Sequence, residues 1–264
     1  MFPQNKNGYV SDGKYNYSKI MEQTFYDSTP FQYGYSSKEE ILDNMNPNLK
    51  EVIEKSEGKT ITDIGCGCGR NLVYSSKFAK KLIGVDLSSS SLDFAKNFVQ
   101  SDNLELVLGN NLNIPLESDF SDLVISDGVV HHTGDTIAAF KECVRILKPR
   151  GFLYLAVYKK YRYYPFLYKY IGAILRFLNK SKVGNFIMEN TFVLIHYLLY
   201  FILRKQKLSL KETRNIFYDY FITPIATFQS KKEVENWINT NNCLLEKYDR
   251  TNGNCHIFII KKNE

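Results

Sequence analysis

The fold of this chain is decided at residues 60–70, whose sequence is TITDIGCGCGR. The β-branched run at residues 60–64 predicts a short buried strand. Asp63 leads into a turn that has glycines at alternate positions, Gly65, Gly67 and Gly69. Glycines let the backbone approach a ligand closely, and the helix that follows offers free N–H groups. The spacing differs from Gly-x-Gly-x-x-Gly, which argues against a bound pyrophosphate, and the preceding Asp suits a ligand with an ammonium group.

Strand and helix patterns alternate after this turn. The predicted strands are residues 60–64, 81–86, 104–108, 123–126 and 152–158, and the predicted helices between them are 71–78, 90–100 and 137–147. Such alternation predicts a parallel sheet covered on both faces. Two more strands, at residues 244–249 and 255–261, flank Asn252 and Gly253, a pair typical of a hairpin turn. The predicted fold is therefore α/β, with a doubly wound, mostly parallel seven-stranded sheet that ends in an antiparallel hairpin.

Composition divides the chain into four parts. We expect an N-terminal arm with a lid helix at residues 38–54, a Rossmann-like core, a helical insertion after the fifth strand, and a C-terminal helix and hairpin that complete the core. Their bounds are residues 1–54, 55–158, 159–224 and 225–264. The insertion is aromatic and basic, and its helices are predicted at residues 165–178 and 191–203. The last part begins with Ser230 and Glu233, which form a capping box for a helix through Trp237.

Charge is concentrated in the insertion. The whole chain has a net charge of +6, whereas residues 159–211 alone hold eleven Lys and Arg and one acidic residue. The apolar run at residues 192–203 is too short to span a membrane. We favour a helical cap with a basic outer face, and peripheral contact with an anionic membrane through residues 159–211 is the alternative. Aromatic and basic residues at 159–170 are also able to stack nucleobases, but no recognised RNA-binding module accompanies them, so a nucleic-acid partner is not expected.

The five cysteines are odd in number and irregular in spacing. This argues against a disulfide framework, and no metal site is expected because no other ligands stand at suitable spacing. The first nineteen residues are polar and do not resemble a signal peptide. We therefore expect a cytoplasmic location, with a peripheral place at the membrane as the alternative.

Four segments resemble, in order and spacing, the motifs of class I S-adenosylmethionine-dependent methyltransferases. They are residues 62–69, 84–88, 122–132 and 147–151. Residues 218–237 are similar to the same region of the UbiE-like, small-molecule group of that family. The resemblance implies a Rossmann-like fold, S-adenosyl-L-methionine as cofactor, and in-line transfer of a methyl group to a small-molecule acceptor. A lipid or quinone methyltransferase at the membrane, and a non-catalytic module that binds S-adenosylmethionine, are the alternatives.

The cofactor-binding residues come from the ends of the first four strands. Asp86 ends the second strand, where an acidic side chain accepts hydrogen bonds from ribose hydroxyls; capping of the next helix is its alternative role. The resemblance implies that Asp63 lies near the methionine end of the cofactor, and that Asn110 replaces an Asp that binds the adenine amino group. The predicted set is Asp63, Gly65, Cys66, Gly67, Gly69, Asp86, Leu87, Asn110, Asn111, Leu112, Ser126 and Asp127.

The acceptor side is less well marked in the sequence. His131 and His132 follow the fourth strand, in a loop that in this family faces the transferred methyl group. A histidine there is able to take a proton from an attacking O–H or N–H, and a helix-cap or packing role is the alternative. The predicted substrate contacts are Tyr33, Tyr35, Tyr158, Tyr218 and Tyr220. Neither the acceptor atom nor the oligomeric state follows from the sequence.

Overall fold

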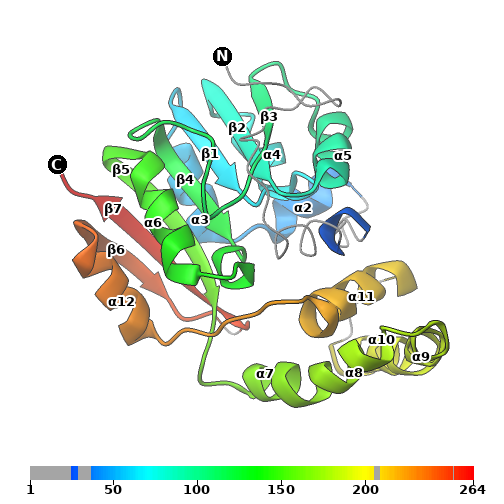
Figure 1. Cartoon of the computed structure of the whole chain (residues 1–264). Helices are drawn as coiled ribbons and strands as arrows, with labels where there is room; N and C mark the ends of the chain where they lie inside the picture. The colour runs from blue at the N-terminus through cyan, green and yellow to red at the C-terminus, as the bar shows by residue number, and fades with distance from the viewer. Residues whose placement is uncertain (1–24, 29–36, 205–208, 252) are drawn as a thin grey trace.

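The computed structural model of the chain describes residues 25–28, 37–204, 209–251 and 253–264. Its centre is a seven-stranded sheet in the order β3-β2-β1-β4-β5-β7-β6 (Figure 1). The first five strands in that order are parallel, and β7 runs antiparallel to both of its neighbours. This confirms the predicted fold class. The strands are β1 Thr60–Ile64, β2 Lys81–Asp86, β3 Leu104–Leu108, β4 Ser121–Asp127, β5 Leu147–Tyr158, β6 Cys243–Asp249 and β7 Cys255–Lys262.

Helices cover both faces of the sheet, because successive strand residues point to opposite sides. Val124 of β4 belongs to a core with Phe140 and Trp237 on one face. Its neighbours Leu123 and Ile125 belong to the core on the other face. The helices of the core are α2 Lys38–Asn44, α3 Pro47–Glu54, α4 Arg70–Ser75, α5 Ser89–Val99, α6 Thr136–Ile146 and α12 Lys231–Thr240. The predicted capping box of Ser230 and Glu233 is present at α12.

The helix expected at residues 38–54 and the fifth strand differ from their predicted bounds. The single helix expected at residues 38–54 is split into α2 and α3, because Pro47 has no N–H to donate and disfavours helical geometry in the residue before it. Asn46 caps the second piece by accepting the N–H of Asn48. β5 begins at Leu147, before the predicted residue 152, because Leu147 already pairs with Ser121 of β4.

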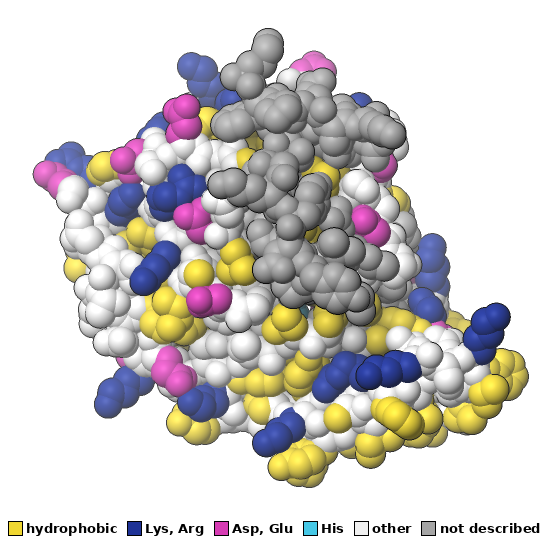
Figure 2. Space-filling view, viewed as in Figure 1, with side chains coloured by type: hydrophobic (Ala, Val, Ile, Leu, Met, Phe, Trp, Pro, Cys, Tyr) yellow, Lys and Arg dark blue, Asp and Glu magenta, His cyan; other side chains and the backbone are white. Residues whose placement is uncertain are grey.

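The insertion begins with two long helices, each interrupted by one π-helical turn. The first consists of α7 Tyr163–Phe166, η2 Leu167–Ile171 and α8 Gly172–Leu178. The second consists of α9 Lys182–Ile187, η3 Met188–Phe192 and α10 Val193–Arg204. The predicted start of the second helix at residue 191 was wrong: Ser181 accepts the N–H of Gly184 and caps a helix that begins at Lys182. Figure 2 shows hydrophobic and basic side chains along this lower part of the molecule.

This longer helix also overturns the argument that its apolar run is too short for a membrane. Lys182–Ile202 has 21 residues with a mean hydropathy of 1.2. Within the described residues it is the one helix long and apolar enough, by length and composition alone, to cross a bilayer. The length criterion therefore does not separate a membrane role from a cap on the sheet.

The chain returns to the core through α11 Leu210–Phe217 and η4 Tyr218–Ile222. A separate small core holds the insertion together and includes Leu175, Met188, Val193, Phe217 and Ile222. The insertion lies at the end of the sheet where β5 finishes, below the carboxyl ends of the parallel strands (Figure 1). Ligands of open α/β sheets bind at that edge, so the insertion covers the side of the core where a site is expected.

We expect Ser181→Ala to destabilise the start of the second long helix by about 1 kcal/mol, because Gly184 loses its capping partner. Hydrogen exchange of the amides of residues 184–187 should accelerate about fivefold. Ser118→Ala, at an exposed loop position, is the matched control. Unchanged exchange in S181A would contradict a helix start at Lys182.

Candidate cofactor and active site

The glycine turn between β1 and α4 lies against the loop that follows β4. Gly65 has φ +70°, and a Cβ atom there would overlap the side chain of Val129. Gly67 has φ +51°, and a Cβ atom there would meet no heavy atom within 4 Å. The first glycine therefore allows two loops to pack together, whereas the second leaves bare backbone beside open space. A ligand is able to approach the backbone at Gly67 closely.

Asp86 at the end of β2 holds this turn in place. Its Oδ2 accepts the N–H of Gly67 at 2.8 Å, and its Oδ1 accepts the N–H of Ser88 at 2.9 Å. Burial raises the pKa of Asp86, while these N–H groups act to lower it. Ser88, not Asp86, caps α5 by accepting the N–H of Ser91. Each carboxylate oxygen keeps a further lone pair, so the ribose role of Asp86 stays a prediction that this geometry permits.

Asp63 is a buried acid near the end of β1. It is 1% exposed, and neither carboxylate oxygen has a hydrogen-bond partner of ordinary geometry in the described part of the chain. Burial and the nearby Asp127 raise its pKa well above the usual range, whereas Arg70 and Asn71 act in the opposite direction. Arg70 is itself paired with Asp127 at 2.6 Å. An unsatisfied acid beside an open glycine turn fits a cationic ligand, such as the ammonium and sulfonium groups of S-adenosylmethionine.

Other predicted cofactor residues are turned toward the protein. The Oδ1 of Asn110 accepts the N–H of Leu112 at 2.7 Å, so its side chain closes its own turn. Ser126 is enclosed beside Cys143 of α6, and the Cys66 thiol lies against Gly84 in the core. Cys66 and Ser126 therefore have only backbone groups to offer a ligand. The roles of Leu87 and Asn111 stay predictions.

The two adjacent histidines have opposite surroundings. His131 is fully buried, its ring lies 3.8 Å from that of Tyr158, and its Nδ1 accepts the Tyr158 N–H at 3.3 Å. Burial lowers the pKa of His131 well below its usual range, so the ring is neutral. This geometry favours the packing role for His131. His132 instead donates from Nδ1 to the carbonyl of Ile225 at 2.8 Å, which leaves Nε2 as the proton-accepting atom of the neutral ring.

Asp219 of η4 completes this side; the sequence placed residues 218–220 near the mouth of the site but assigned Asp219 no role there. Its Oδ1 lies 3.8 Å from Nε2 of His132, and its Oδ2 accepts a hydrogen bond from the hydroxyl of Tyr158 at 3.4 Å. After burial, Asp127 and Asp219 both help to raise the pKa of the Cys255 thiol to about 12. The insertion thus brings an acid to the loop that packs on the glycine turn. A lone acid within the aromatic run at residues 218–222 was the one available signal for it.

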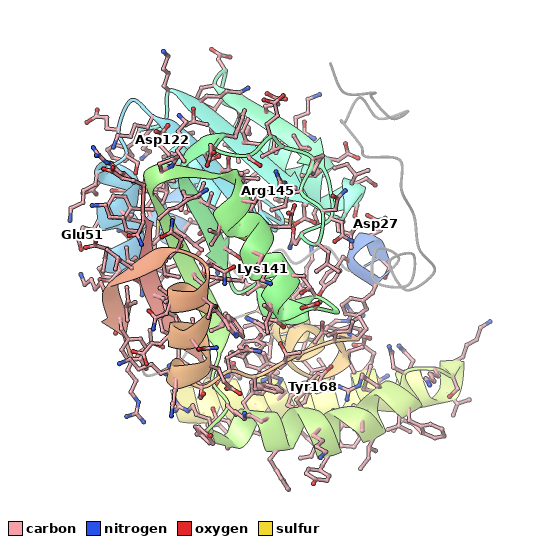
Figure 3. All side chains as sticks on the ribbon, turned by 60° about the vertical axis from the view of Figure 1, so that its left-hand side comes forward. Asp27, Glu51, Asp122, Lys141, Arg145 and Tyr168 are labelled. Carbon is pink, nitrogen blue, oxygen red and sulfur yellow. The ribbon has the colours of Figure 1, made fainter. Side chains whose placement is uncertain are left out.

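The N-terminal segment 25–28 bridges the two sides of the site. Ser90 of α5 donates its hydroxyl to the carbonyl of Asp27 at 2.9 Å. The hydroxyl of Tyr26 lies 3.2 Å from that of Thr223, which follows η4. Figure 3 shows Asp27 beside the sheet and above the insertion. Tyr33 and Tyr35, which were predicted to contact substrate from this arm, lie outside the described residues.

The remaining predicted tyrosines occupy different places. Tyr158 lies beside His132 and Asp219. Tyr220 packs on Tyr164 at 5.1 Å between ring centroids, in the aromatic cluster that also contains Tyr158. Tyr218 donates to Glu189 at 2.6 Å inside the insertion, so it is directed away from the histidine loop. Tyr168 of the same aromatic cluster faces the core from the first long helix (Figure 3).

The chain is similar to known methyltransferases. Residues 62–155 match the family model described as a methyltransferase domain. A human protein named probable tRNA methyltransferase 9B is 33% identical over 116 residues, which are 42% of this chain and 24% of that protein. The chain thus spans about a quarter of that relative's length. A Coxiella burnetii protein named ubiquinone biosynthesis O-methyltransferase is 25% identical over 175 residues, which are 62% of this chain and 72% of that protein.

Solved structures share the fold. A crystal structure of an S-adenosylmethionine-dependent methyltransferase from Mesorhizobium loti superposes with a TM-score of 0.57 and 13% sequence identity. The superposition covers 84% of this chain and 100% of the other. At that level of identity the likeness concerns the fold alone.

We expect Asp63→Asn to make the empty protein more stable at neutral and alkaline pH. The raised pKa means that folded Asp63 keeps a proton that the unfolded chain releases above the usual value of 3.8. The wild type therefore loses stability as pH rises above that value, and D63N does not. Melting temperatures of both proteins at about pH 5 and about pH 8 test this.

Exposed Asp102 provides the control, since Asp102→Asn should leave the pH dependence of the wild type unchanged. If the melting temperature of the wild type falls with rising pH no more steeply than that of D63N, Asp63 does not destabilise the folded protein at higher pH.

Proposed function

We propose that the chain is a class I S-adenosylmethionine-dependent methyltransferase and that it transfers the methyl group of S-adenosylmethionine to a small-molecule acceptor. The observation that carries the proposal is the buried Asp63, whose carboxylate has no hydrogen bond of ordinary geometry in the described residues, at the entry to the turn that contains the open backbone of Gly67. A cationic amino-acid nucleoside supplies the positive charge that this acid lacks. The domain match and the shared fold support the same cofactor.

Three groups of this chain would hold the cofactor. Asp63 and the backbone at Gly67 would receive its methionine end, and Asp86 would accept hydrogen bonds from its ribose. When bound, S-adenosylmethionine supplies a methyl group on a sulfonium, which is a good electrophile with a neutral leaving group. The protein therefore has to align the acceptor atom with the methyl group and exclude water.

The pair of His132 and Asp219 would receive the proton of an O–H or N–H acceptor. Nε2 of His132 and the carboxylate of Asp219 face each other at 3.8 Å, and each is able to accept a proton. The carbonyl of Ile225 orients the ring. His132 and Asp219 would take the proton that the acceptor oxygen or nitrogen loses as it gains the methyl group and the sulfur–methyl bond breaks, and the negative charge of Asp219 would stabilise the resulting imidazolium.

The choice of a small molecule rests on the acceptor side. The Coxiella relative, whose name states an O-methyltransferase of ubiquinone biosynthesis, is matched over most of its length. Tyr158 and its aromatic neighbours form a buried apolar cluster beside the proton acceptors. An RNA acceptor is the second candidate, because the human relative is named a probable tRNA methyltransferase. That match covers less than half of this chain.

Calorimetry with S-adenosylmethionine and with its demethylated product tests the cofactor. We expect both to bind, and D63N to weaken S-adenosylmethionine at least about tenfold, because a charge-assisted contact is lost. D102N should bind as the wild type does. Since D63N is also expected to be more stable when empty, weaker binding is not attributable to unfolding. No detectable affinity of the wild type for either compound would refute the proposal.

Transfer of labelled methyl groups identifies the acceptor. We expect label to pass to an organic-soluble or small polar compound in a metabolite extract and not to total tRNA. Label in tRNA alone would replace the proposed acceptor with the second candidate. No label in either fraction, with cofactor binding intact, would favour a module that binds without turnover.

With that acceptor, Asp219→Asn should lower kcat about a hundredfold and leave the affinity for S-adenosylmethionine unchanged, because the proton acceptor is impaired while the cofactor site is intact. His132→Gln should behave in the same way. D102N is again the matched control. Retention of kcat within about twofold in D219N would exclude the pair from proton transfer.

A further inference from the structure

The first long helix of the insertion is apolar on its outward side as well as its inward side. Tyr164, Tyr168 and Leu175 point inward and are buried. The outward positions are 52–73% exposed and carry Tyr163, Phe166, Tyr170, Ile174 and Phe177. Their spacing of three and four residues places them on one side of the helix. A helix on the surface of a soluble domain normally carries polar residues there.

The second long helix has the same character over a greater length. Its outward positions are 52–72% exposed and carry Val183, Phe186, Ile195, Leu198 and Ile202. Between Lys182 and Arg204 the only charged residue is Glu189, which is paired with Arg214 and with the hydroxyl of Tyr218. These outward positions of the two helices together form what we call the outward face. Figure 2 shows several hydrophobic patches, with basic side chains between them, along the lower edge of the molecule.

Exposed apolar surfaces of this extent mark interaction sites, because soluble proteins rarely leave them in water. We propose that the outward face docks on the surface of an anionic lipid bilayer. Aromatic and aliphatic side chains on it would enter the region between the headgroups and the acyl chains. The proposal concerns location and does not rest on the proposed reaction.

Basic residues surround the outward face. Lys169, Lys180 and Lys182 are exposed next to it, whereas Lys159 and Arg176 are turned toward backbone carbonyls of Gly253 and Phe221. Such a rim complements anionic headgroups, each basic residue near the surface strengthening binding about fivefold. A second copy of the chain would instead bring two basic rims together, which opposes association. The charge pattern therefore favours lipid over a dimer as the occupant.

The helix lies on the bilayer and does not cross it. Met188 and Val193 on its inward side are buried in the small core with Phe217 and Ile222. A spanning orientation would strip these contacts, because neither α11 nor η4 is able to follow the helix into the hydrocarbon. The outward face alone therefore enters the bilayer.

Sedimentation of the full chain with lipid vesicles tests the proposal. We expect binding to vesicles of phosphatidylglycerol and phosphatidylcholine, and little binding to phosphatidylcholine alone. The triple variant Ile174→Gln, Phe177→Gln, Phe186→Gln should lower the ratio of bound to free protein at least about tenfold. Its control is Ile137→Gln with Leu244→Gln, two exposed apolar residues outside the insertion, which should bind as the wild type does.

Variants with reversed charge test whether the lysines beside the outward face contribute to vesicle binding. Lys180→Glu with Lys182→Glu should weaken binding at least about tenfold. Lys77→Glu with Lys232→Glu, at exposed positions on other parts of the chain, should change it little. Because every replaced side chain is exposed, melting temperatures should stay close to that of the wild type, which shows that lost binding is not lost folding.

Four results would overturn the proposal. They are wild-type protein that stays in the supernatant with anionic vesicles, and a triple variant that binds as well as the wild type. The third is a wild-type protein that is dimeric in light scattering while the triple variant is monomeric, which would identify a second copy as the occupant. The fourth is vesicle-bound protein that alkaline carbonate does not extract, which would indicate a spanning helix.

Discussion

Close packing of two loops at the carboxyl ends of β1 and β4 is the constraint on which the site depends. Gly65 has no Cβ, so Val129 is able to lie directly on the glycine turn. Asp86 fixes the same turn from β2 by accepting the N–H of Gly67. The loop that carries the histidines therefore begins next to the glycine turn, whose backbone is open at Gly67. Because three neighbouring strands meet there, cofactor and acceptor groups are brought together by the sheet itself.

Much of the fold was predictable because its signals are local. The β-branched strands, the glycine turn and the Asn-Gly hairpin each act within a few residues, and they place six of the seven strands to within about two residues; β5 is the exception. The start of β5 was missed because it depends on pairing with β4, whereas the other errors have local causes that the apolar pattern does not show. The start of the second long helix depends on Ser181 and on Gly184 packing under the chain at Leu178, and its first turns contain Asn, Gly and Thr, which weaken the apolar pattern.

The two halves of the candidate site differ in how far the sequence predicts them. The cofactor half follows a sequence motif, so its residues were predicted together. The acceptor half combines His132 with Asp219, which are far apart in the chain and meet only because the insertion folds back on the sheet. His131 and His132 are neighbours in sequence, yet one is enclosed against Tyr158 and the other faces an acid. No pattern in the sequence distinguishes such surroundings.

The lone buried acid at the end of β1 also affects how the empty protein behaves. A buried carboxyl group without a hydrogen bond of ordinary geometry destabilises the fold of the protein without cofactor. Any compound that neutralises Asp63 therefore raises the melting temperature by more than its other contacts alone would provide. Thermal shift becomes a sensitive screen for cofactor analogues with this protein, and compounds that keep a positive charge at the methionine end should stand out from neutral nucleosides.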